Sequence, residues 1–462
     1  MRLAWFTPWP PQPTGVAGRS ADVTRELARR DHAIDVFVDA SEILLPGRWP
    51  DGPPARGEVR VQNAHDFVWR HGRDPYDLLV YQVGNSKLHE FIWPYLFRWP
   101  GLVVLHDARL HHARGHALLR HGRQTAYRAE FRWNHPDAGE GAEIGVRGFS
   151  GVYSYQWPMV RAVVESARLV ATHARRTQMQ LADASPGRAI VYIALGMGRT
   201  ELPNDVLRAE IRRAWGVEPE AVTFGVFGGL TEEKRIEPIL RAFAAARARV
   251  PHGYLVFGGT ATADVDLDNL IESLRLGDRV IRLPPLDDDQ FEDSIAAIDV
   301  SLNMRWPTAL EMSGPWVQAI AAGRPTVMMD LAHLTDIPTL DPRIWRRHGP
   351  GAESIEGDAE AVAVAVDVLD EEHSLRLAIE MLGQNAALRA RLGEAARRYW
   401  EREHTLERMT DDYQRAISRA AALSAPDVQL PEHLRPDPLA LTRTLAEPFG
   451  NPAITVVEEL KR

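Results

Sequence analysis

The chain has 462 residues, too many for one compact core, so its length predicts two domains of roughly 150–200 residues each. A hydrophobic fraction of 45% and a charged fraction of 25% are typical of a soluble globular protein, and the net charge of −9 argues against nucleic-acid binding. The absence of cysteine excludes disulfides, thiolate metal sites and a cysteine nucleophile, and it fits a reducing cytoplasm.

The amino terminus, "MRLAWFTPWPPQP", has a short apolar run interrupted by prolines. This run is too short for a signal sequence or a membrane span, and no later run approaches about eighteen apolar residues. We therefore expect a cytoplasmic protein, with peripheral contact to a membrane surface left open.

Short apolar runs alternate with helical stretches along most of the chain. The stretch "SADVTRELARRD" (residues 20–31), with Ser20 as its expected N-cap, and "RIEPILRAFAAARARV" (residues 235–250) have helical spacing. Buried strands separated by helices are typical of parallel sheets covered on both faces. The expected strands lie within residues 2–6, 33–39, 77–82, 101–107, 167–174, 188–196, 221–229, 253–259, 279–285, 297–304 and 324–330.

These strands form two series, which predicts an α/β protein with two doubly wound, Rossmann-like domains. We expect a first domain over residues 1–195, with an insertion at about 111–160 that is rich in histidine, arginine and aromatic residues, and a second domain over residues 196–400. Residues 359–422 consist almost entirely of helix formers, and residues 425–462, with several prolines, are expected to form an extended tail.

A glycine turn follows one expected strand of the second domain. Gly228 and Gly229 stand in "FGVFGGLTEEKRIEPIL" (residues 224–240), and Lys234 follows at a helix start. Glycines let backbone N–H groups approach an anion, and a helix amino terminus and a lysine both stabilise phosphate. On its own, the pattern fits equally well a tight turn followed by solvated basic residues.

A second turn of this kind lies in "RWPTALEMSG" (residues 305–314). Ser313 and Gly314 predict a helix amino terminus that faces the same crevice. Arg305 suits a bidentate contact to phosphate, and Glu311 suits hydrogen bonds from sugar hydroxyls. The alternative is a buried helix with Ser313 as its N-cap and an ion pair between Arg305 and Glu311. Two phosphate-binding turns in one domain favour a diphosphate ligand.

The first domain supplies further polar groups at the ends of its strands. The glycine-containing loop "PPQPTGVAGRS" (residues 10–20) lacks the G-x-G-x-x-G fingerprint of dinucleotide binding. His106 and Asp107 end one strand and Asn85 follows another, at the edge where doubly wound sheets bind ligands. A histidine at a strand end can equally be a structural hydrogen-bonding residue. "HDARLHH" (residues 106–112) fits no established metal-ligand spacing, so we expect no metal.

These motifs resemble those of the retaining family-four glycosyltransferases, which are nucleotide-sugar-dependent enzymes of the GT-B fold. The resemblance extends over nearly the whole chain to about residue 420. It rests on Gly15-Val16-Ala17, "GLVVLHD", "FGGLTEEKRIEPILRAF" and "LVFGG". The most specific stretch is "PTALEMSGPWVQAIAAGRPTV" (residues 307–327), which is similar to the branch reading P-T-x-G-E-x-S-G.

The resemblance implies two Rossmann-like domains that face each other across a cleft, with a helix within residues 401–424 crossing back to the first domain. It places Lys234 at the donor diphosphate. It places His106 beside the donor sugar. Glu311 would then lie near the sugar or the phosphates. The remaining implied positions are Gly228, Gly229, Ser313 and Gly314 on the donor side and Gly15, Val16, Asn85 and Asp107 on the acceptor side.

Three positions depart from the commoner family pattern. Gly229 occupies the place of an arginine, and the two glutamates of the E-x7-E pattern fall on Leu310 and Gln318. Glu311 is therefore one position out of register, and Gln318 would contact the ribose as an amide. Arg305 is our candidate for the missing cation.

The resemblance implies a hexosyltransferase that transfers sugar from a nucleoside-diphosphate sugar with retention of configuration, in the biosynthesis of a glycan, polysaccharide or glycoconjugate. Its acceptor would be a glycan, a lipid-linked molecule or a small molecule, and no cofactor, metal or nucleic acid is expected. The alternatives are a catalytically degenerate nucleotide-sugar binder and a sugar phosphorylase or epimerase of the same fold. An NAD-dependent oxidoreductase fits the sheet pattern, but the chain lacks the glycine fingerprint.

Overall fold

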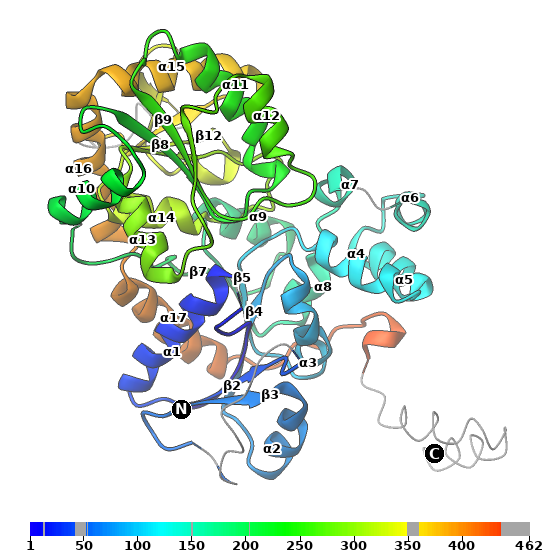
Figure 1. Ribbon diagram of the computed structural model, residues 1–462. Helices are drawn as coiled ribbons and strands as arrows, with labels where there is room; N and C mark the ends of the chain where they lie inside the picture. The colour runs from blue at the N-terminus through cyan, green and yellow to red at the C-terminus, as the bar shows by residue number, and fades with distance from the viewer. Residues whose placement is uncertain are drawn as a thin grey trace, which may run out of the picture.

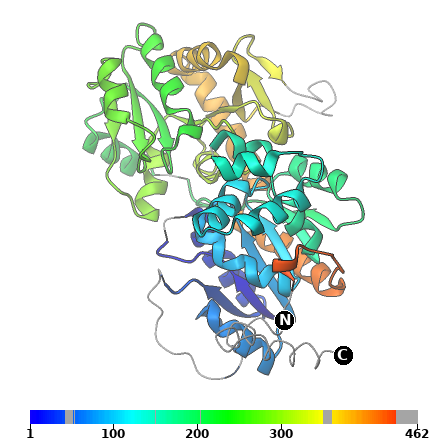
Figure 2. The same ribbon diagram turned by 90° about the vertical axis from the view of Figure 1, so that its right-hand side faces the viewer.

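The computed structural model describes residues 1–12, 14–41, 52, 54–148, 151–202, 204–348 and 360–435. Two α/β domains lie one above the other, each built on a largely parallel sheet that is flanked by helices (Figures 1 and 2). The α/β class with two doubly wound sheets, predicted from alternating strands and helices, is confirmed.

The first sheet has seven parallel strands in the order β3-β2-β1-β4-β5-β6-β7. One face packs against α1 (Gly15–Arg29) and α17 (Leu406–Ala422), which lie side by side in Figure 1. The other face packs against α2 (Phe67–Arg73), α3 (Trp93–Arg98) and α8 (Arg161–Ser166). The strands are β1 (Arg2–Phe6), β2 (Ala33–Val38), β3 (Val59–Asn63), β4 (Leu78–Val83), β5 (Leu102–Leu105), β6 (Leu169–Thr172) and β7 (Ile190–Tyr192).

The second sheet has eight strands in the order β10-β9-β8-β11-β12-β15-β13-β14, and its last strand runs antiparallel to its neighbour. The strands are β8 (Val222–Phe227), β9 (Gly253–Gly258), β10 (Val280–Arg282), β11 (Val300–Asn303), β12 (Thr326–Met329), β13 (Thr339–Asp341), β14 (Arg346–His348) and β15 (Ala363–Val366). Its helices are α10 (Asp205–Ala214), α11 (Ile236–Ala246), α12 (Leu267–Ser273), α13 (Asp288–Ala297), α14 (Gly314–Ala321), α15 (Glu371–Gln384) and α16 (Ala386–Glu403).

Two local predictions are wrong. Residues 363–366 form the buried strand β15 between β12 and β13, although residues 359–422 were expected to be helical. Alternating valines suit a central strand, and this preference overrides the high helix propensity of the alanines between them. The N-cap of α1 is Thr14 and not Ser20, which lies inside the helix and hydrogen-bonds Thr7 at 2.7 Å.

Residues 111–156 form four short helices at one side of the first domain (Figure 1). They are α4 (His111–Arg120), α5 (Gln124–Asn134), α6 (Gly141–Arg147) and α7 (Gly151–Gln156), and they share a small hydrophobic cluster around Tyr127 and Phe131. The buried carboxylate of Glu130 pairs with Arg114 at 2.7 Å and with His433 at 2.7 Å. The chain after α17 is therefore attached to this helical insertion.

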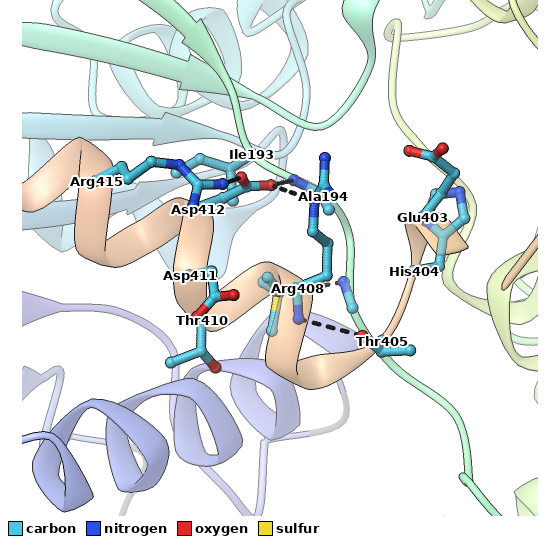
Figure 3. A network of polar contacts seen from close by, with 12 residues as sticks. Ile193, Ala194, Glu403, His404, Thr405, Arg408, Thr410, Asp411, Asp412 and Arg415 are labelled. Atoms are coloured by element: carbon cyan, nitrogen blue, oxygen red, sulfur yellow. Dashed lines mark hydrogen bonds and ion pairs between the residues drawn. The ribbon is translucent and has the colours of Figure 1, made fainter. Parts of the chain in front are cut away.

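The domains are joined twice, by the segment between β7 and α10 and by the turn between α16 and α17. Figure 3 shows how α17 is fixed to the first of these connections: Asp412 accepts a 2.9 Å hydrogen bond from the Ala194 amide and pairs with Arg415. Thr405 caps α17 by accepting a 3.1 Å hydrogen bond from the Arg408 amide. Both crossings are thus connected by buried polar contacts.

None of the described helices is long and apolar enough to cross a membrane. The aromatic and aliphatic side chains of the tryptophan-rich stretch at residues 91–101 are buried in the core of the first domain or packed against it. Residues 436–462, the larger part of the predicted tail, lie outside the described residues.

Candidate active site

The chain order of the strands reverses between β1 and β4 in the first sheet and between β8 and β11 in the second. The loops that follow strands beside such a reversal form a crevice, and ligands of doubly wound folds bind there. Gly15 follows β1, Lys234 follows β8 and Arg305 follows β11. The sequence-predicted residues therefore lie at the crevice of their own sheet.

The loop after β8 places Lys234 next to the end of that strand. Gly228 has a φ of 90°, which favours glycine, and a methyl group there would lie 2.9 Å from Nζ of Lys234 and 3.4 Å from Pro315. Nζ of Lys234 donates to the carbonyl of Phe227 and forms no ion pair with a described carboxylate. Burial, helped by the nearby charge of Arg305, lowers the pKa of Lys234 to about 7.

Helix α14 points its amino end at this lysine. Ser313 is its N-cap and accepts a 3.3 Å hydrogen bond from the Trp316 amide, while Gly314 and Pro315 form the start of the first turn. The first backbone N–H groups of a helix lack intrahelical partners and carry the positive end of the helix dipole. The arrangement can therefore hold an anion between α14 and Lys234.

Arg305 and Glu311 form an ion pair, with Nε and Oε1 2.7 Å apart. The other carboxylate oxygen of Glu311 accepts a 2.9 Å hydrogen bond from Thr308. The alternative interpretation of this stretch, a serine N-cap followed by an Arg–Glu pair, thus describes the contacts present here. Because 36% of the Arg305 side chain is exposed, its guanidinium can still receive a phosphate oxygen.

On the first domain, Gln82 and His173 position the ring of His106. Its Nε2 donates a 2.8 Å hydrogen bond to Oε1 of Gln82, which also accepts one from Tyr413 on α17, and its ring lies against His173. Burial, together with the neighbouring His173, lowers the pKa of His106 well below its ordinary value. His106 is therefore neutral at pH 7 and acts as a hydrogen-bonding group.

Asp107 lies beside the loop after β4. Its carboxylate accepts a 2.6 Å hydrogen bond from the backbone amide of Asn85, and the side chain of Asn85 accepts one from the Ala113 amide at the start of α4. Burial, with the nearby charge of Glu311 adding to it, raises the pKa of Asp107 to about 7. The two acids, one from each domain, thus influence each other across the cleft.

The two domains touch directly next to these acids. The amides of Ala108 and Arg109 donate to the Ala309 carbonyl at 2.8 and 3.1 Å, and the Arg109 guanidinium donates to the Thr308 carbonyl at 2.9 Å. Leu310 packs against the hydrophobic cluster of the first domain. A leucine at this position therefore serves interdomain packing, where the family pattern has a glutamate.

Neither sequence comparison finds a relative: no protein-family model matches the chain, and no curated protein matches it. Solved structures do match. The chain is similar to sucrose-phosphate synthase from Thermosynechococcus elongatus, with 16% identity, 91% of this chain and 98% of that chain covered, and a TM-score of 0.60. It is also similar to HepE from Anabaena, solved in complex with UDP-glucose, with 16% identity, 90% of this chain and 99% of that chain covered, and a TM-score of 0.59. For WaaG, a glycosyltransferase involved in lipopolysaccharide biosynthesis, the identity is 15%, 90% of this chain and 98% of that chain are covered, and the TM-score is 0.57.

The chain has the GT-B fold. In this GT-B protein Gly15 and Val16, predicted to lie on the acceptor side, form the first turn of α1, where Thr14 accepts a hydrogen bond from the Val16 amide at 3.4 Å. Gly229, beside Gly228, is exposed, and a methyl group there would meet nothing within 4 Å. Gln318 donates a 3.3 Å hydrogen bond to Glu292 on α13, so it does not join the group around Lys234.

Two residues of the GT-B cleft, Arg19 and Tyr155, were not among those predicted from the sequence. Arg19, on α1, reaches the start of α14, since a methyl group at Gly314 would lie 3.3 Å from its Nη1. Tyr155, on α7, donates a 3.0 Å hydrogen bond to Glu233, the residue before Lys234. The position of Arg19 four residues after Gly15 puts both on one helix face and is a usable signal. The contact of Tyr155 has no counterpart in any sequence pattern.

Over the described ranges, no group of three or more histidine, aspartate or glutamate side chains is arranged to hold a metal ion. The cationic side chains described at the cleft include Lys234, Arg305 and Arg19.

Proposed function

We propose that this protein is a nucleotide-sugar-dependent glycosyltransferase. The observation that carries the proposal is the position of Lys234, an ammonium group without a carboxylate partner in the described structure, next to the amino end of α14 in a GT-B cleft. A lysine and a helix amino terminus together suit a diphosphate. HepE, of similar fold, was solved with UDP-glucose, which supports a nucleoside-diphosphate sugar as the donor.

Sugar transfer builds negative charge on the departing diphosphate, and groups fixed in place beforehand stabilise that charge. Lys234 and the first turn of α14 supply two such groups, and Arg305 supplies a third once a phosphate oxygen competes with Glu311. The donor would bind the second domain and the acceptor the first, where Asp107 and Asn85 lie.

We infer retention of the anomeric configuration, through attack on the face from which the diphosphate leaves. The bond between C1 and the phosphate oxygen breaks and a bond from C1 to the acceptor oxygen forms, while the acceptor proton moves to the departing phosphate. This route needs no carboxylate nucleophile and leaves His106, which is neutral, to hydrogen-bond the sugar. Glu311, held by Arg305 and Thr308, would orient a sugar hydroxyl or the phosphates. Because Lys234, Arg305 and the amino end of α14 can offset the charge of the leaving diphosphate, we propose a reaction that needs no divalent metal or cofactor.

A catalytically degenerate nucleotide-sugar binder is the second candidate. Leu310 and Gln318 favour it, because the first packs on the opposite domain and the second bonds α13 instead of extending toward a ribose. Such a protein would bind the donor but neither transfer nor hydrolyse its sugar.

The first experiment is a thermal-shift screen against UDP, GDP, ADP and dTDP and their common sugar conjugates. A ligand that binds the folded state at a hundred times its Kd adds about 2.7 kcal/mol to the free energy of unfolding. One nucleotide should raise the melting temperature clearly more than the others. A flat response to all of them at millimolar concentration would contradict a donor site.

Release of nucleoside diphosphate from the stabilising sugar conjugate, measured with acceptor panels and with EDTA present, then separates the two candidates. A transferase releases product and a degenerate binder does not. The product anomer, read by NMR, tests retention, and Lys234→Ala should lower turnover by roughly ten- to a thousand-fold.

A further inference from the structure

Arg19 lies on α1 of the first domain, yet its guanidinium is at the second domain. Nη1 is 3.8 Å from the sulfur of Met197 in the interdomain connection. Methyl groups at Gly15 and Gly314 would lie 2.8 and 3.3 Å from the same nitrogen. Glycine at both positions therefore leaves room for this guanidinium between the first turn of α1 and the first turn of α14.

Among the described acids, Asp107 acts on Arg19 by its charge without forming an ion pair with it. Arg19 forms no ion pair with a carboxylate in the described parts of the chain, and its Nε is buried without a hydrogen-bond partner. The groups beneath it are Gln82 and the imidazoles of His106 and His173, and burial lowers the pKa of His173 to about 3. Burial also lowers the pKa of Arg19, to about 10, so its guanidinium remains charged at pH 7.

The first turn of α14 thus has a cation on each side. Arg19 approaches Gly314 from the first domain, and Lys234, through the Gly228 position, approaches Pro315 from the second. Two poorly solvated positive groups beside the positive end of a helix are unfavourable unless an anion joins them. A single phosphate contact at Lys234 would leave the charge of Arg19 without a partner.

We propose that Arg19 binds the donor diphosphate from the first domain, so that the two phosphates are held between cations of both domains. The proposal rests on the function proposed above. Its consequence is that a bound diphosphate joins the two halves of the cleft, and release of the nucleoside diphosphate requires them to separate. Charge on the ligand then sets how tightly the cleft closes.

The test compares Arg19→Met, Arg19→Lys and the control Arg25→Met, which changes an exposed arginine of the same helix. The probes are UDP, inorganic pyrophosphate and uridine. If GDP, ADP or dTDP stabilises the wild type, that nucleotide and its nucleoside replace UDP and uridine. We expect Arg19→Met to weaken UDP and pyrophosphate by roughly ten- to a hundred-fold, the size of one charge-assisted hydrogen bond. Uridine affinity should stay within about twofold, because uridine carries no phosphate. Arg19→Lys should recover part of the loss.

An arginine that only braces the domains would behave differently. Its replacement would lower the melting temperature and weaken UDP and uridine alike, and this result would overturn the proposal. Unchanged UDP affinity in Arg19→Met, with weakened affinity in Lys234→Ala, would also overturn it while leaving the donor site intact. If the wild type binds none of the four nucleotides, the proposed function fails and the role of Arg19 fails with it.

Discussion

Replacing Lys234 by methionine removes the ammonium group and keeps most of the length of the side chain. The ordinary pKa of a lysine is 10.5, and burial lowers that of Lys234 to about 7. At about 1.4 kcal/mol per pKa unit, keeping this group charged in the folded protein costs roughly 5 kcal/mol. Methionine loses the hydrogen bond to the Phe227 carbonyl, worth about 1 kcal/mol. We therefore expect Lys234→Met to raise the free energy of unfolding of the protein without nucleotide by up to about 4 kcal/mol at pH 6.5.

The gain should depend on pH in a defined direction. Between pH 7 and 10.5 the unfolded wild-type chain binds a proton that the folded protein has released, so the free energy of unfolding of the wild type rises with pH in this window. Below pH 7 both states are protonated and the full destabilisation is present. The advantage of Lys234→Met should therefore be largest at pH 6.5 and shrink toward pH 9.5.

Differential scanning calorimetry at both pH values, without nucleotide, measures this difference. Lys87→Met is the matched control, because Lys87 is exposed. The same variant should lose the thermal shift produced by nucleoside diphosphates, since its stability comes from losing the charge that binds them. A Lys234→Met protein that melts below the wild type at pH 6.5, by an amount that pH does not change, would refute the assignment of Lys234 as a strained, ligand-binding cation.

Two further outcomes follow from buried acids. Burial and the charge of Glu311 raise the pKa of Asp107 to about 7, so kcat/KM should have an acidic limb as a carboxylate forms that can accept a hydrogen bond from the acceptor. Because the pKa of Lys234 is also lowered to about 7, loss of its proton should give an alkaline fall, and Asp107→Asn should abolish the acidic limb alone in the pH–rate profile. Asp412→Ala leaves the buried Ala194 amide without an acceptor and should lower the free energy of unfolding by about 1–3 kcal/mol in thermal denaturation. An unchanged melting temperature would show that Asp412 does not stabilise the connection between the domains.

The fold could be predicted from the sequence largely because parallel strands are buried on both faces and therefore appear as uninterrupted apolar runs. All eleven runs that were expected to form strands contain one, from β1 to β12 apart from β3. The exceptions have physical causes. In β15 valine alternates with alanine directly before α15, so its local composition resembles that of the helix after it. In β3 the sequence Val59–Asn63 is only partly buried and carries polar residues.

The site was less predictable, because its members come from separate loops. Glycines mark the turns at Gly228 and Gly314 in the sequence, since those turns need residues without side chains. The spacing of Arg19 from Gly15 places both on one face of α1, but the sequence does not show that α14 packs against that face. The sequence left two roles open for Arg305, a contact to phosphate or an ion pair with Glu311, and the structure contains the ion pair.

The departures from the family pattern are related through the positive charge that is available to the diphosphate. The family pattern that the sequence resembles has an arginine at the position of Gly229 in the loop after β8, and Arg305 would replace it only in part because Glu311 holds it. On our proposal Arg19 restores the missing positive charge from the opposite domain. This exchange has a mechanical consequence, since a cation on the loop after β8 contacts phosphate in any arrangement of the domains, whereas one on α1 does so only when they are closed. Charge stabilisation would then be complete only in the closed cleft, where Leu310 packs on the first domain and water is excluded from the transferring sugar.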